Sequence, residues 1–218
     1  MARYRLHCVG ASGNSFKVAL FLNCAGLDWE PIGVDVDVAG GQTRDAAWRA
    51  AINEMGEIPV LEVDGRRMSQ SGAILLWLSE IHGVFSPAGA EEKLETMRWL
   101  LFDNHRFTGF FAAYRVLHSM TPEPPHPAVL AYMRPRVENA LAIVEGHLAD
   151  RRFMLGKRPT IVDFSLAGYL YYPTAETGFD LAAAFPAIDA WLGRLAALPG
   201  WKQPYEMMPV GNSLPVRC

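Results

Sequence analysis

The chain has 218 residues, half of them hydrophobic, and its 20 Lys and Arg stand against 23 Asp and Glu for a net charge of −3. This length and apolar content suffice for two compact domains with buried cores. No basic block is present, which argues against nucleic acid or an anionic membrane as a partner, and no run of about 18 apolar residues predicts a membrane span.

Three cysteines, Cys8, Cys24 and Cys218, are too few and too scattered for a disulfide framework or a C-x-x-C redox pair. This usage is typical of a reducing compartment, so we expect a cytoplasmic protein. The opening residues lack the apolar run of a signal peptide. The histidines have no metal-ligand spacing, and we expect neither a metal nor a bound cofactor.

The first ~80 residues alternate strand and helix signals in the order β-α-β-α-β-β-α. The expected strands are residues 4–9, 29–38, 58–63 and 66–68, and the expected helices are residues 16–25, 43–52 and 69–81. Asp64-Gly65 is a strong hairpin signal. This order predicts an α/β domain over residues 1–82, with a mixed sheet that has crossover helices in its first half and a hairpin in its second.

Strand signals disappear after a Gly- and Pro-containing break at residues 82–89, which we interpret as a linker. The expected helices beyond it are residues 91–120, 128–150, 161–172 and 186–198. The loop 121–127 is too rich in proline for a helix, and Pro135 predicts a start or a kink. The tail from 201 shows little periodicity. We therefore expect an all-α domain over residues 90–218.

The most informative segments read NEMGEIPVLEVDG at residues 53–65 and MSQSGAIL at residues 68–75. A proline that opens a strand, Pro59, leaves neighbouring backbone groups outside the ladder, where they can bind an extended peptide. Ser71 lies at a predicted helix N-terminus, a site that favours a carboxylate. The simpler interpretation is that Gln70 and Ser71 only cap the helix.

This pattern resembles the glutathione site of the cytosolic glutathione transferase superfamily. Ile58-Pro59 matches the Val/Ile-Pro pair of the family, whose proline is cis, and Gln70-Ser71 matches its Glu/Gln-Ser pair. The resemblance implies that the Ile58 backbone holds the cysteinyl part of glutathione, and that Gln70 and Ser71 hold its γ-glutamyl carboxylate and amine. It also implies a thioredoxin-like N-terminal domain, an all-α C-terminal domain, a homodimer, and glutathione as a co-substrate.

Two positions depart from the family pattern. Glu57 stands where members often carry a basic residue that pairs with the glycyl carboxylate of glutathione, and Glu54 replaces the usual proline after Asn53.

A further match lies at residues 156–165, where Thr160 and Asp163 have the spacing of a helix capping box. It resembles the buried capping motif of the family's C-terminal domain, and its role is structural.

Glutathione chemistry requires the thiolate, while a free thiol has a pKa of about 8.5. A hydrogen-bond donor at a helix N-terminus lowers that pKa. The candidates are Ser12, Asn14 and Ser15, which otherwise are only turn and cap residues. Ser12 matches by position the catalytic residue of serine- and cysteine-type members, whereas Tyr4 lies too early in the strand for the tyrosine type.

The predicted helix 91–120 carries an aromatic run interrupted by polar residues. In the family this helix lines the pocket for the electrophile, so His105, Arg106, Phe110 and Tyr114 are candidates for that pocket, although aromatic residues here also suit a core. The implied reaction is addition of the glutathione thiolate to a small hydrophobic electrophile. The alternatives are another glutathione-dependent reaction (isomerisation, dehalogenation or peroxide reduction) and a non-catalytic protein that binds ligands or scaffolds partners.

Overall fold

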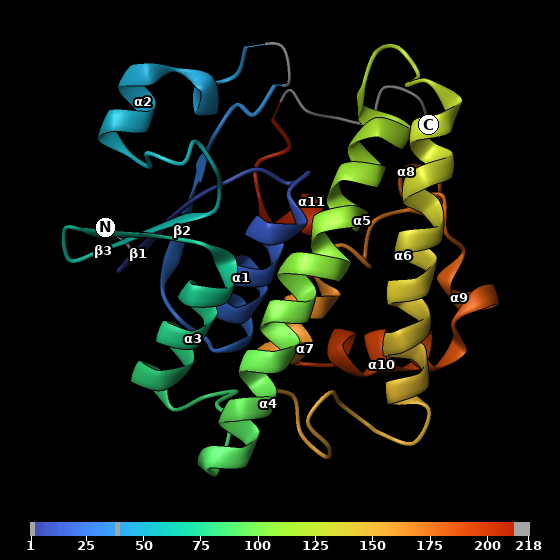
Figure 1. Cartoon of the computed structure of the whole chain (residues 1–218). Coiled ribbons are helices and arrows are strands. Elements are labelled where there is room, and N and C mark those ends of the chain that lie inside the picture. The colour runs from blue at the N-terminus through green and yellow to red at the C-terminus, as the bar shows by residue number, and fades with distance from the viewer. Residues whose placement is uncertain (1–2, 38–39, 212–218) are drawn as a thin grey trace. The chain divides into compact units, whose positions relative to one another are not determined.

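The computed structural model describes residues 3–37 and 40–211, which divide into two compact units (Figure 1). The first unit comprises the described residues up to Val84 together with residues 198–211, and the helical unit comprises residues 85–197. The sequence analysis predicts that the tail from residue 201 belongs to the all-α domain. The described part of this tail, residues 201–211, instead packs in the first unit. Backbone hydrogen bonding explains this placement, because Gly10 N–H donates to the Pro209 carbonyl at 2.6 Å.

The first unit is built on a four-stranded mixed sheet, as predicted. Its strands are β1 (Tyr4–Cys8), β2 (Trp29–Gly33), β3 (Val60–Val63) and β4 (Arg66–Ser69), in the order β2-β1-β3-β4. β1 pairs parallel to β2 and antiparallel to β3, and β3 and β4 form the predicted hairpin. β2 ends five residues earlier than the predicted end at 38, because its partner β1 ends where Cys8 pairs with Gly33.

Four α-helices belong to the described part of this unit. They are α1 (Gly13–Cys24), α2 (Ala46–Ala51), α3 (Ser71–His82) and the short α11 (Pro204–Met207). α1 and α3 pack together on one face, whose strand residues Tyr4, Leu6 and Cys8 are fully buried. α2 does not join α1 and α3 but lies apart from both, at the upper left of the view in Figure 1. The predicted helix 43–52 is divided into a 3-10 turn and α2, because Asp45 caps α2 by accepting the Trp48 N–H at 2.7 Å.

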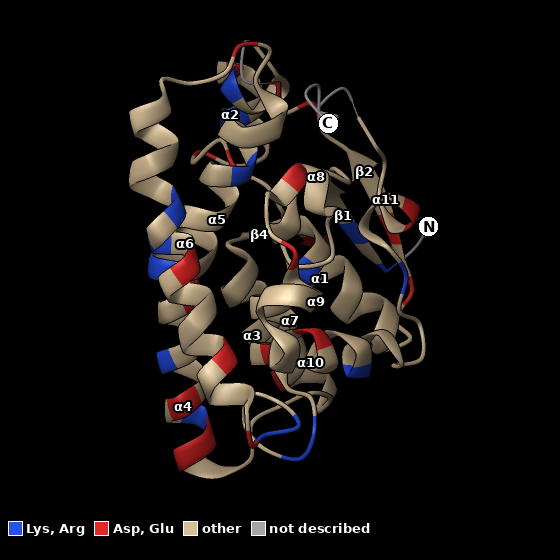
Figure 2. Cartoon of the chain, turned by 90° about the vertical axis from the view of Figure 1, so that its right-hand side faces the viewer, with Lys and Arg blue, Asp and Glu red and all other residues tan. Residues whose placement is uncertain are grey.

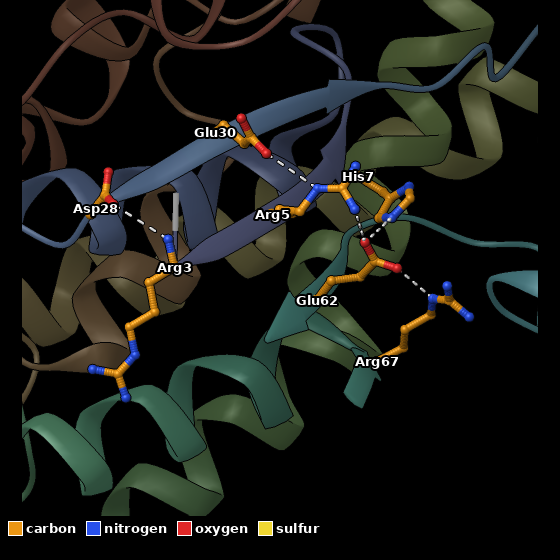
Figure 3. Close-up of polar contacts among 7 residues, drawn as sticks. All are labelled: Arg3, Arg5, His7, Asp28, Glu30, Glu62 and Arg67. Carbon is orange, nitrogen blue, oxygen red and sulfur yellow. Dashed lines mark hydrogen bonds and ion pairs between the residues drawn. The ribbon is translucent and has the colours of Figure 1, made fainter. Parts of the chain in front are cut away.

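The face of the sheet away from α1 and α3, here called the outer face, carries a row of alternating charges across all four strands (Figure 3). Arg5 of β1 donates to Glu30 of β2 at 3.2 Å and to Glu62 of β3 at 2.9 Å, and Glu62 accepts from Arg67 of β4 at 2.6 Å. The ring of His7, which is buried, lies 3.5 Å from the Glu62 carboxylate. Partial burial raises the pKa of Glu62, but Arg67, His7 and Arg5 together hold it below its ordinary value.

The buried position of His7 makes stability depend on pH. Burial lowers the pKa of His7, and Glu62 offsets this shift only in part. The unfolded chain, with histidine pKa values of about 6.5, therefore binds a proton before the folded chain does. We expect the free energy of unfolding to fall as the pH drops below about 6.5, and His7→Gln to reduce that slope. Urea unfolding at a series of pH values measures it, with the exposed His105→Gln as control; equal slopes in the two variants would contradict the assignment.

The described part of the helical unit consists of helices and connecting segments, with an isolated antiparallel bridge between Phe153 and Gly156. The α-helices are α4 (Gly89–Phe102), α5 (Thr108–Arg115), α6 (Pro127–Leu148), α7 (Ile161–Ala167), α8 (Thr174–Thr177), α9 (Leu181–Ala184) and α10 (Pro186–Ala196). The predicted helix 91–120 is interrupted by π-helical turns at Asp103–Phe107 and Val116–Met120. Pro135 lies inside α6 without ending it.

Charged residues are interspersed along the long helices α4 and α6 (Figure 2). Arg98 pairs with Glu95 on α4 at 2.5 Å, and Arg134 pairs with Glu138 on α6 at 2.8 Å. Pairs at this helical spacing stabilise exposed helix faces modestly. No helix among the described residues is long and apolar enough to cross a membrane.

The predicted capping pair at Thr160 and Asp163 is confirmed, and it is the centre of a buried network. Asp163 is 0% exposed. Its carboxylate accepts from the Thr160 N–H at 2.8 Å and hydroxyl at 3.1 Å, from the Met154 N–H at 2.8 Å and from the Trp191 indole at 2.9 Å. One side chain thus fixes the start of α7, the preceding loop and α10.

Removal of this carboxylate should be costly. Asp163→Ala leaves several buried donors without an acceptor, so we expect a loss of roughly 3 kcal/mol or more in the free energy of unfolding. The matched control is Asp150→Ala, whose exposed pair with Arg151 should contribute under about 1 kcal/mol. Urea denaturation of both variants provides the comparison, and similar losses in the two would exclude Asp163 as the organising group.

Candidate active site

The N-terminus of α1 presents the three candidate residues in different environments. Ser12 is the N-cap, and its hydroxyl accepts the Ser15 N–H at 3.1 Å. Ser12 and Asn14 are partly exposed, whereas Ser15 is 0% exposed and its hydroxyl has no hydrogen-bond partner among the described residues. The Ser12 hydroxyl, already used as an acceptor, keeps its own proton to donate. Ser12 and Asn14 are therefore accessible to a ligand, and Ser15 is not.

The N-termini of α1 and α3 meet in the first unit. The Ser71 hydroxyl, at the first residue of α3, donates to Asn14 Oδ1 on α1 at 3.5 Å. Free backbone N–H groups and a partial positive charge mark each helix N-terminus. Two such ends at one point favour a carboxylate or a thiolate there. The structure thus brings together Asn14 and Ser71, which are far apart in the sequence.

Gln70, directly before α3, has an unusual backbone. Its φ of +68° lies in a region that non-glycine residues rarely adopt and that costs about 1–3 kcal/mol. Its side-chain amide donates to Glu57 Oε2 at 2.9 Å. Such backbone strain concentrates at ligand-binding sites. No signal in the sequence indicates this conformation, and sequence reasoning missed it.

The turn formed by residues 53–57 sets the position of Ile58 and Pro59. The Asn53 amide donates to the Glu57 carbonyl at 2.9 Å, and Asn53 Oδ1 accepts the Met55 N–H at 3.2 Å. The peptide bond between Ile58 and Pro59 is cis, which confirms that prediction. The ladder of β3 begins only at Val60, so the backbone groups of Ile58 lie outside it. Asn53 was missed as an organiser of the site, although an asparagine in a turn is a known signal.

The four residues proposed for the electrophile pocket lie in the helical unit in unlike surroundings. His105 and Arg106 are exposed on the π-helical turn before α5, and Phe110 is partly exposed. Tyr114 is only 2% exposed, and its hydroxyl accepts from Arg134 at 3.1 Å. Tyr114 therefore packs within the helical unit, while the pocket role of all four residues stays a prediction.

The strain at Gln70 predicts a separation of stability from binding. Gln70→Gly removes the side chain but suits a positive φ, so we expect the free energy of unfolding to stay level or rise by up to about 1 kcal/mol. Gln70→Ala loses the same side-chain contacts without that relief and should be the less stable of the two. Thermal unfolding of both variants tests this ordering; a less stable glycine variant would show that the backbone is not strained.

The fold is a thioredoxin-like α/β domain joined to an all-α domain. The glutathione S-transferase N-terminal domain model matches residues 6–89, and the glutathione S-transferase C-terminal domain model matches residues 127–194. The chain belongs to the glutathione transferase superfamily.

Solved structures and a curated relative agree with this assignment. A crystal structure of a glutathione S-transferase from Xanthobacter autotrophicus Py2 is 33% identical, with a TM-score of 0.78 over 93% of this chain and 98% of that chain. One from Pseudomonas fluorescens Pf-5 is 29% identical, with a TM-score of 0.82 over 93% and 99%. The disulfide-bond oxidoreductase YfcG of Escherichia coli is 28% identical over 208 residues, 91% of this chain and 93% of the relative.

Proposed function

We propose that this chain is a glutathione transferase that joins the glutathione thiolate to a small hydrophobic electrophile. The observation that carries the proposal is the meeting of two helix N-termini at Asn14 and Ser71, beside the Gln70–Glu57 pair. Such a site suits a ligand that has a carboxylate at one end and a thiol a few ångströms away. Glutathione has both groups.

Each part of the site then has a role. Ser71 and Gln70 bind the γ-glutamyl carboxylate and amine, and the Ile58 backbone pairs with the cysteinyl part as an added strand would. The Ser12 hydroxyl donates to the sulfur and, with the α1 N-terminus, favours the thiolate. The thiolate electron pair forms the new S–C bond. In a substitution the leaving group departs with the electron pair of the bond that breaks, whereas in an addition the π electron pair of the electrophile moves to its acceptor atom, which then takes up a proton.

The helical unit supplies the remainder of the proposal. His105, Arg106, Phe110 and Tyr114 contribute to the electrophile site. α4 leaves Leu94, Met97 and Leu101 exposed at the spacing of a single helix face. An apolar face of this kind favours burial against another surface, and we propose a homodimer that covers it.

A second candidate function comes from a different observation. The second candidate is a disulfide-bond oxidoreductase, because the relative YfcG carries that name. A non-catalytic binder is the third possibility on this fold. Retention on glutathione-agarose followed by a chloronitrobenzene conjugation assay separates them: turnover supports the transferase, activity with a disulfide substrate alone supports the oxidoreductase, and retention without either supports the binder.

The role of Ser71 gives the first prediction on binding. Ser71→Ala removes a hydrogen bond to the γ-glutamyl carboxylate, so glutathione affinity should fall by about 1–2 kcal/mol, roughly tenfold. The fold should lose only a modest amount of helix-capping stability. Calorimetric titration with glutathione measures the change, with the exposed Ala73→Ser on the same helix as control. An unaltered affinity in Ser71→Ala would refute the assignment.

The role of Ser12 decides whether the chain is an enzyme. Ser12→Ala removes the hydroxyl that donates to the glutathione sulfur. This loss should raise the pKa of the bound thiol and reduce turnover roughly ten- to a hundredfold, with little change in glutathione affinity. Thiolate absorbance against pH in the glutathione complex measures this for Ser12→Ala and Asn14→Ala. If only Asn14→Ala raises the thiol pKa, Asn14 is the donor; if neither does, the binder becomes the better account.

A further inference from the structure

A separate cavity lies in the first unit between α2 and the outer face of β3 and β4. Its volume is about 420 Å³, and the residues that line it include Arg49, Asn53, Glu54, Val60, Arg67 and Ser69. This volume falls in the range of small-molecule sites, about 300–1,000 Å³. The lining is mostly polar, which points to a ligand recognised by charge and hydrogen bonds.

The cavity is on the side of the sheet opposite α1 and α3. Side chains alternate between the two faces of a strand, so Val60 shares a face with Glu62, and Ser69 shares one with Arg67. The intervening Leu61 is fully buried on the face that α1 and α3 cover. The cavity is therefore distinct from the site at the N-termini of these two helices.

Two guanidinium groups on the cavity wall are held in place and keep free donors. The Nε atom of Arg67 donates to Glu62 at 2.6 Å, and its Nη1 atom donates to the Ala51 carbonyl at 2.5 Å. Arg49 is fixed through Nε, which donates to the Thr43 carbonyl at 2.8 Å. Within the described part of the chain, Nη2 of Arg67 and both Nη atoms of Arg49 have no partner. A guanidinium oriented in this way suits the oxygens of a carboxylate or a phosphate.

The charge balance of the cavity also favours an anion. Glu62 is shared between Arg5 and Arg67, so it offsets only part of the Arg67 charge. Glu54 lines the cavity and offsets one of the two arginine charges, so the lining carries two positive charges against one negative charge. The Ser69 hydroxyl lies on the same wall and supplies a neutral donor. We propose that this cavity is a binding site for a compact anion that bears a carboxylate or phosphate group.

The experiment is calorimetric titration of the whole chain with inorganic phosphate and, separately, with malonate, in the presence and absence of saturating glutathione. We expect saturable binding at one site for at least one probe, and the tighter probe identifies the anion class. Arg49→Gln and Arg67→Gln should each weaken binding roughly tenfold. Arg66→Gln, which changes an exposed residue of β4 outside the cavity wall, is the matched control and should bind as the unaltered chain does.

Glu54→Gln provides the decisive arm, because it removes a like charge and should tighten binding severalfold, a gain that disruption of the fold does not produce. No saturable binding by either probe would overturn the proposal. So would displacement of the probe by glutathione, or an equal loss in Arg66→Gln. Glutathione binding in the same titrations reports separately on the proposed function, which stands or falls independently of this cavity.

Discussion

The two hydrogen bonds of the Asn53 amide group fix the segment on which both sites of the first unit depend. One bond holds the Glu57 carbonyl and the other holds the Met55 N–H, so a single buried side chain closes the turn from both ends. Three consequences follow from that closure. Ile58 and Pro59 enter the sheet in a fixed position, Glu57 faces Gln70, and the back of the turn forms part of the wall between α2 and the sheet.

The helical unit solves a related problem with buried charges. Asp163 gathers four donors, Asp103 accepts from Ser165 and Thr108 at 2.5 Å each, and Arg115 pairs with Glu176 in the interior. A buried charge without partners is very costly, so each group constrains the segments that supply its partners. Such networks favour one arrangement of helices over its alternatives. In the candidate active site, by contrast, Ser12 and Asn14 are partly exposed and Gln70 is exposed, while Ser71 is buried.

Local signals in the sequence predicted much of the fold. The Asp64-Gly65 hairpin, the mixed sheet and the Thr160–Asp163 cap each depend on residues close together in the chain, and all three are confirmed. The same local reasoning placed the start of α1 three residues late, because Ser12, Asn14 and Ser15 are all suitable caps and only the bond between Ser12 and Ser15 identifies the one in use.

Features that depend on distant residues escaped prediction. The tail packs in the first unit through contacts such as that of Asn23 with the Gly200 carbonyl, which no local periodicity indicates. The contact between Asn14 and Ser71 joins the starts of two helices, and the cavity combines α2 with β4. The φ of Gln70 does not follow from residue type, because neighbouring elements impose it.

The π-helical turn at Asp103–Phe107 has a consequence for how such chains diverge. A π turn holds one residue more than the α-helical turn it replaces, and the helix continues on both sides. The extra residue falls where Asn104, His105 and Arg106 are exposed, while Asp103 and Phe107 stay buried. Deletion of one residue from the exposed part of this turn should therefore convert it to an α-helical turn, with α4 and α5 continuing on either side. Alignments within the family should accordingly allow a single-residue gap inside this helix rather than in the loops that flank it.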